Sequence, residues 1–226
     1  MCCILANMFL HSSFTAGSIS YLVETSDVLA YDTLVKAFTA ADQEEPLLIQ
    51  KDKKVTEEKP DHEIDVAAFQ EKWLNLQDTH EFHGLLRKFG VTRTQGLRLA
   101  PGGHAVTITK ESLKAVLHKA SETDLEIMVF TGSAGCIQIH TGLVKNLLQT
   151  GPWFNVLDPD FNMHLREDAI ASVWLVKKPT VDGIVTSIEV FDQSGEIIVQ
   201  FFGKRKPGIP ENEHWRLMVN ETAVIS

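Results

Sequence analysis

The C-terminal part of the chain alternates between apolar and polar residues with a period of two. Turn residues such as Asp182-Gly183 separate the alternating segments. Because successive side chains of a strand point to opposite faces of a sheet, each segment is predicted to form a β-strand. The predicted strands span residues 125–130, 136–142, 153–158, 161–166, 170–179, 184–191 and 196–205.

The segments before these strands carry apolar residues at every third or fourth position, which predicts helices. Asp65 is the predicted N-cap of a helix over residues 66–90. One face of that helix carries Phe69, Trp73, Leu76, His80 and His83. A second helix, over residues 110–120, turns Leu113, Val116 and Leu117 inward. Helices grouped before many strands predict an α+β fold, a large antiparallel sheet with helices packed on it.

The chain divides into three predicted parts. Residues 1–45 hold one short strand at 17–24 and one helix at 26–38, which are too few elements to close a core. The apolar side of that helix carries Leu29, Leu34, Val35 and Phe38. Residues 46–65 are rich in charge and form a predicted linker, and residues 66–226 form the main domain.

Composition narrows the class of protein. Of the 226 residues, 44% are apolar, which is enough to build a buried core. The formal net charge of −9 argues against a protein that grips nucleic acid. Three cysteines, two of them adjacent, suggest neither a disulfide framework nor a zinc site, so the reducing cytoplasm fits best. The apolar start of the chain, about ten residues, is too short to span a membrane.

The two histidines of the 66–90 helix are the first candidates for chemistry, since the sequence has no nucleotide-binding, serine-hydrolase or zincin motif. One interpretation is that one of the two histidines packs in the core with its ring hydrogen-bonded and the other is solvated. The alternative is that they are ligands of a metal. A non-haem metal would need a third ligand, and Asp78 and Glu81 do not share their face well. A haem needs one axial imidazole, apolar walls and cations for its propionates.

Basic residues that could supply such cations occur at Lys177-Lys178, Lys204-Arg205-Lys206 and Arg93. The alternative interpretation is that these residues are solvated and protect the strand ends from pairing with other chains. Phe201 and Phe202 are consecutive in a predicted strand, so they are expected to face opposite sides of the sheet. Either of them could be an ordinary core residue.

The stretch from Trp73 to Glu211 resembles the second half of the cytoplasmic haem-utilisation proteins of Gram-negative bacteria, the hemin-degrading factor family. Members of that family have two similar halves, each with a large antiparallel sheet and helices, and haem binds in the cleft between them. The stretches that carry the resemblance are DTHEFHGLLRKFGVTR, VFTGSAGCIQIHTG, GPWFNVLDPDFNMHLRED, VWLVKKPTVDG and FFGKRKPGIPE.

The resemblance implies a set of ligand contacts. It places the axial iron ligand at His80, and His83 is a neighbour able to take over as ligand. The implied contacts to the propionates and the rim of the haem are Arg93, Lys178, Gln200 and Arg205. The implied aromatic contacts are Phe130 and Phe202, and other members can have Tyr at the second of these positions.

Only the tail of the first half has a counterpart, in residues 17–38, so residues 1–45 are expected to be a remnant of that half. The distal groups of the haem cleft come largely from the missing part. The implied function is that of a soluble haem-binding protein of bacterial haem uptake and iron acquisition, which holds haem or transfers it between donor and acceptor proteins. The alternatives are a haem-degrading enzyme that releases iron and a truncated relic with impaired binding. A homodimer could imitate the two halves.

Overall fold

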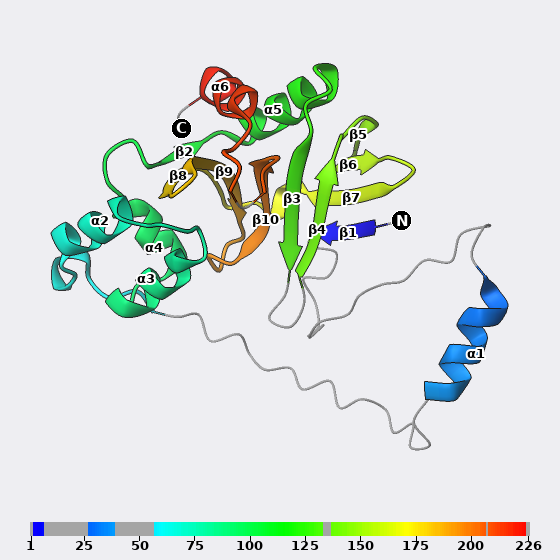
Figure 1. Cartoon of the computed structure of the whole chain (residues 1–226), viewed down its shortest axis with the longest axis horizontal. Helices are drawn as coiled ribbons and strands as arrows, with labels where there is room; N and C mark the ends of the chain where they lie inside the picture. Colours follow the sequence, from blue (N-terminus) through cyan, green and yellow to red (C-terminus); the bar gives the residue numbers. More distant parts are fainter. Residues whose placement is uncertain (1, 7–26, 39–56, 133–136, 207, 225–226) are drawn as a thin grey trace.

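The structure is a computed structural model, and it describes residues 2–6, 27–38, 57–132, 137–206 and 208–224. Figure 1 shows two β-sheets side by side, with helices on both faces of the larger sheet. The predicted α+β class, a large antiparallel sheet with helices packed on it, is confirmed. The predicted N-terminal strand at 17–24 lies outside the described residues.

The larger sheet has six strands, and every neighbouring pair in it is antiparallel. Five of the seven predicted strands belong to this sheet and the other two to a second sheet that was not predicted, whereas the four-residue β2 was missed. In spatial order the strands are β2 (Ala105–Ile108), β8 (Ser172–Thr180), β9 (Gly183–Phe191), β10 (Ile197–Gly203), β3 (Ile127–Gly132) and β4 (Ile137–Gly142).

The smaller sheet has four strands, of which the sequence predicted the two central ones. Its edge strand β1 pairs in parallel with β7, and its other pairs are antiparallel. In spatial order the strands are β1 (Cys2–Ala6), β7 (Phe161–Arg166), β6 (Trp153–Leu157) and β5 (Leu147–Thr150).

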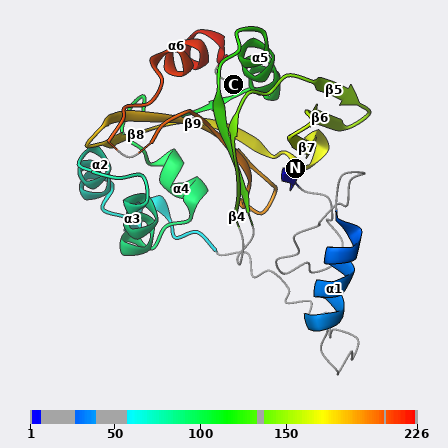
Figure 2. The same ribbon diagram turned by 45° about the vertical axis from the view of Figure 1, so that its right-hand side comes forward.

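The helices cover opposite faces of the larger sheet (Figure 2). On one face lie α5 (Lys110–Glu122) and α6 (Glu213–Thr222). On the other lie α2 (Val66–Leu74), α3 (Glu81–Phe89) and α4 (Arg93–Arg98). Two short 3-10 turns, η1 (Asp61–Glu63) and η2 (Glu167–Ala169), complete the main domain. The helix predicted over 110–120 is therefore confirmed, whereas α4 and α6 were missed.

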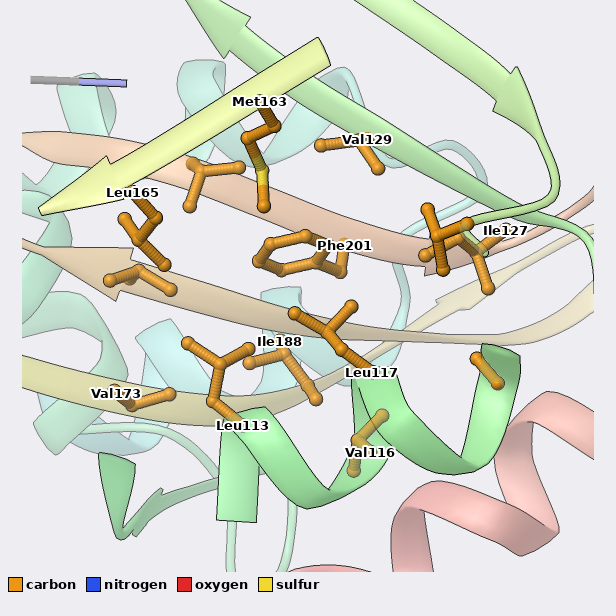
Figure 3. Packing of buried hydrophobic residues seen from close by; sticks show 14 of the residues in the cluster. Leu113, Val116, Leu117, Ile127, Val129, Met163, Leu165, Val173, Ile188 and Phe201 are labelled. Atoms are coloured by element: carbon orange, nitrogen blue, oxygen red, sulfur yellow. The ribbon is translucent and has the colours of Figure 1, made fainter. Parts of the chain in front are cut away.

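The main core lies between α5, α6 and the two sheets. Figure 3 shows Phe201 at its centre, among side chains from β3, β7, β9 and α5. Phe201 is fully buried, and Phe202 faces the other side of the sheet, as the alternation predicts. A bulge at the start of β10, where Ile198 has no partner in β9, precedes this regular register.

The predicted 66–90 helix is two helices, and this part of the prediction is wrong. The first ends at Leu74, where the Asn75 side chain donates to the Glu71 carbonyl at 2.7 Å. In the connecting loop Asp78 accepts from the backbone N–H of His80 at 2.7 Å. These short polar side chains compete with helical hydrogen bonds for the backbone and break the helix. His80 and His83 are both exposed, so neither continues the buried stripe to which the prediction assigned them.

The end of the predicted linker packs on α4. Glu58 accepts from the Thr92 hydroxyl at 2.8 Å and from Arg98 Nη2 at 2.9 Å. Gln95, which is fully buried, donates to the Lys59 carbonyl at 2.6 Å and to Asp61 Oδ1 at 2.9 Å. The division of the chain into domains stays a prediction, but these contacts attach the residues just before α2 to the main domain.

The N-terminal helix α1 (Val28–Phe38) occupies the position predicted for it. It lies apart from the two sheets in Figures 1 and 2. Its apolar residues Leu29, Leu34 and Phe38 are 78%, 58% and 83% exposed and belong to neither core cluster of the described residues. That this region is a remnant of a first half also stays a prediction.

A buried carboxylate fixes the chain after β10 to the middle of the sheet. Both oxygens of Glu211 accept from the Thr186 N–H, at 2.9 and 3.0 Å, and the Trp215 indole donates to the Thr186 carbonyl at 2.9 Å. Burial raises the pKa of Glu211 from 4.5 to about 7. The folded protein therefore binds the proton of the Glu211 carboxyl group more tightly than the unfolded chain does.

We expect stability to depend on pH through Glu211. The stabilisation is fully present below the unfolded pKa of 4.5 and is lost as the pH rises through about 7. Its loss should lower the free energy of unfolding by roughly 2 to 3 kcal/mol when the pH rises from about 5 to about 8. Urea unfolding at both pH values, with Glu211→Gln as the comparison, measures this. Equal pH dependence in both proteins would contradict it.

Candidate functional site

His80 lies at the N-terminal end of α3, in the loop that follows α2. Its side chain is 93% exposed, and Nδ1 lies 2.5 Å from Asp78 Oδ1. The backbone and side-chain hydrogen bonds from His80 hold the pKa of Asp78 below its ordinary value. A carboxylate on one ring nitrogen fixes the orientation of the imidazole and leaves the other nitrogen, Nε2, for a ligand.

The loop that carries His80 is tied to the end of the large sheet. The backbone N–H of Val181, at the tip of the β8–β9 hairpin, donates to the Gln77 carbonyl at 3.0 Å. Glu81 accepts from the Gln77 N–H at 2.9 Å. The positive charge of Arg205, two residues beyond β10, contributes to the low pKa of Asp78. Arg205 and His80 therefore belong to one neighbourhood.

Residues of β9, β10 and β3 form one row across the sheet, on the face that carries α2, α3 and α4. Glu189 is opposite Gln200, and Gln200 is opposite Phe130. Phe202 lies on the same side, and its ring meets that of Phe130 edge to face with centroids 5.1 Å apart. Gln200 and the two rings are half-buried, and Ile139, opposite Phe130 in β4, is 48% exposed. Aromatic surface is therefore accessible here.

A buried ion cluster stands at the end of this row. Arg93 forms a bidentate pair with Glu189, from Nε to Oε2 at 2.8 Å and from Nη2 to Oε1 at 2.9 Å. Lys178 donates to Glu189 Oε1 at 2.6 Å, and Ser187 donates to the same oxygen at 3.2 Å. Both cations also lie over the Phe82 ring, 5.0 and 4.6 Å from its centroid. The carboxylate is thus held from four donor atoms.

The charges of this cluster affect one another and the nearby His83. Burial lowers the pKa of Lys178 to about 8. Burial also opposes ionisation of Glu189, but the two cations prevail and hold its pKa well below the ordinary value. Partial loss of hydration and the charges of Arg93 and Lys178 lower the pKa of His83, which favours the neutral imidazole that metal ligation needs.

The structure brings the predicted contact residues into three neighbouring groups. Phe130, Gln200 and Phe202 share one face of the sheet. Arg93 and Lys178 meet at Glu189 with His83 nearby, and Arg205 lies near the His80 loop. Their roles toward a ligand stay predictions. The reading of Lys178 as a solvated strand end is wrong, because its side chain is only 5% exposed and ion-paired.

Sequence reasoning missed Glu189 and Phe82. A carboxylate in the strand IVTSIEVF was a usable signal, because the strand carries no other charge and a carboxylate in a buried strand needs a cation. Among the described residues, no three His, Cys, Asp or Glu side chains gather into a group that could hold a metal ion. None of the described helices is long and apolar enough to cross a membrane.

Comparison with known sequences identifies the class of this domain. The family model described as the haemin-degrading HemS.ChuX domain matches residues 90–222. The chain therefore belongs to the HemS/ChuX family, which confirms the resemblance. The hemin transport protein HmuS of Yersinia pestis is 37% identical over 196 residues, which cover 87% of this chain and 56% of HmuS.

Solved structures give the same picture. Holo-PhuS, a heme-binding protein from Pseudomonas aeruginosa, has a TM-score of 0.84 and 49% identity over 91% of this chain and 59% of PhuS. ChuS, a heme oxygenase of Escherichia coli, has a TM-score of 0.76 and 33% identity over 89% of this chain and 59% of ChuS. The chain thus spans little more than half the length of these relatives.

We predict that Glu189→Ala destabilises the domain by about 3 to 5 kcal/mol, because two buried cations would lose their counter-ion. Glu126→Ala is the matched control, since that carboxylate pairs with Lys204 on a partly exposed surface at 2.6 Å. The control should cost about 1 kcal/mol or less. Urea unfolding of both variants measures the difference. If Glu189→Ala lowered the free energy of unfolding as little as the control does, the cluster would contribute little to stability.

Proposed function

We propose that this chain binds haem, with His80 as the axial iron ligand, and holds it or passes it on during bacterial haem uptake. The observation that carries the proposal is the His80 imidazole, which is almost fully exposed while Asp78 occupies its Nδ1. A carboxylate behind a histidine raises the basicity of the ligating nitrogen. Such an imidazole is prepared for a metal that arrives from solvent.

The other groups fit the chemistry of haem. The Phe130 and Phe202 rings and Ile139 offer apolar surface for the macrocycle, although Phe202 donates no hydrogen bond as a tyrosine could. Arg93, Gln200 and Arg205 offer donors for the propionates. Haem bound here would supply iron for axial ligation, and His83, whose pKa is lowered by partial burial and by the charges of Arg93 and Lys178, would serve as the exchange ligand.

The family offers a second candidate function, which is degradation of haem. ChuS is a heme oxygenase, and it matches most of this chain at 33% identity. Oxygen chemistry on haem requires an open position over the iron and a distal pocket. The chain corresponds to little more than half of ChuS, so we rank binding above degradation. We propose the cytoplasm as its location, because the sequence offers no disulfide framework.

A haem titration followed by absorbance tests the ligand. We expect saturable binding to the wild-type protein and a weakened, spectrally shifted complex for His80→Ala. His83→Ala should bind haem but alter its transfer to an acceptor such as apomyoglobin. His214→Ala, which removes an exposed histidine from α6, is the control. An unchanged Soret band in His80→Ala would refute the assignment, and no saturable binding in the wild type would favour the truncated relic.

Ascorbate added to the loaded protein under air separates carriage from degradation. A stable Soret band supports a carrier. Loss of the band, with growth of a bilin-like absorbance that persists when catalase removes free peroxide, would instead support the haem-degrading reaction.

We also propose that a second copy of the chain pairs with the open edge of the large sheet. The exposed residues Ile137 and Ile139 lie on β4, an edge strand that carries no charged side chain. Such an edge pairs readily with another chain. Light scattering should report a dimer, and Ile137→Lys should yield monomers, whereas Val181→Lys, at a residue exposed elsewhere, should not. A monomeric wild type at high concentration would exclude this arrangement.

A further inference from the structure

The ion cluster at Glu189 has more positive than negative charge. Arg93 and Lys178 carry two positive charges and Glu189 carries one negative charge, which leaves one positive charge unneutralised. Of the three side chains, Arg93 is 12% exposed, Lys178 5% and Glu189 not at all. Of the two cations, Arg93 is therefore the more accessible to a ligand that approaches from solvent.

Glu189 determines which edge of that guanidinium is available. The carboxylate takes Nε and Nη2, whereas Nη1 has no hydrogen-bond partner among the described residues. The planar fork of an arginine keeps these groups in a fixed relation, so binding one edge orients the other. The Phe82 ring, 5.0 Å from the guanidinium, and the Thr92 cap at the start of α4 restrict it further.

Lys178 has little opportunity to meet a ligand itself. It is buried, it donates to Glu189, and it lies over the Phe82 ring. Its charge lets Glu189 stay ionised in the middle of the sheet. Displacement of Glu189 by a ligand carboxylate is disfavoured, because it would leave a fully buried anion without its partners.

We propose that Glu189 is a positioning residue for recognition of the ligand's carboxylates. Held by Lys178, it aims the free Nη1 edge of Arg93 at one carboxylate, and Lys178 acts through Glu189 rather than on the ligand. This inference rests on the proposed haem binding and assigns Arg93 the direct contact. It replaces the expectation that Arg93 and Lys178 both contact the propionates.

A charge-neutral double variant tests the proposal. Glu189→Met together with Lys178→Met removes one negative and one positive charge, so the net charge of the cluster is unchanged. Loss of the carboxylate leaves the guanidinium of Arg93 without its buried partner, so the melting temperature of the double variant is measured beside its affinities. The measured quantity is the ratio of affinities for iron protoporphyrin IX and for its dimethyl ester, which lacks free carboxylates.

We expect the wild type to prefer the free acid and Arg93→Gln to lose that preference by about tenfold. The double variant should lose a similar factor, with affinity for the ester unchanged. The control, Glu126→Gln with Lys204→Gln, removes a partly exposed ion pair and should keep the preference. A melting temperature for each variant reports on folding, and the ester reports on the rest of the site.

Three outcomes would overturn the positioning role. One is a double variant with the wild-type preference, since net charge alone would then explain it. Another is equal weakening of both ligands, which would mark a purely structural cluster. The third is a wild type that binds haem through His80 without preferring the acid. Failure of the wild type to bind either porphyrin would instead refute the proposed function.

Discussion

The carboxylate of Glu189 is buried in the middle of the six-stranded sheet, and the rest of the site is arranged around it. A charge in that position costs several kcal/mol unless cations meet it there. One cation comes from the adjacent strand β8 and the other from the start of α4. Because α4 also holds the residues before α2, this contact joins the helical layer to the sheet.

The strands and the α+β class could be predicted because each strand has one face in the core. Phe201 and Phe202 illustrate this, since neighbours in sequence separate into core and open face. The break between α2 and α3 could not be predicted from apolar spacing, because Asn75 and Asp78 bind backbone groups that the spacing ignores. The four-residue strands β2 and β5 are too short to show a period.

The candidate site was predicted as separate residues rather than as an arrangement. The resemblance indicated Arg93, Lys178 and Phe130, but only pairing across β9, β10 and β3 shows which of them are neighbours. Register depends on contacts between distant segments, which a single sequence does not reveal. Glu189 was missed for a related reason, because its partners are 96 and 11 residues away along the chain.

The bulge at the start of β10 bears on how this family of sites can change through insertion and deletion. Beyond Ile198, each residue of the strand alternates between the core and the open face, so a one-residue insertion there would exchange the two sets of side chains. Phe202 would enter the core, and Phe201 would leave it. At the bulge, an extra residue is already accommodated. A change of length before this point leaves the register of the later residues intact, whereas the open face after it can diversify only by substitution.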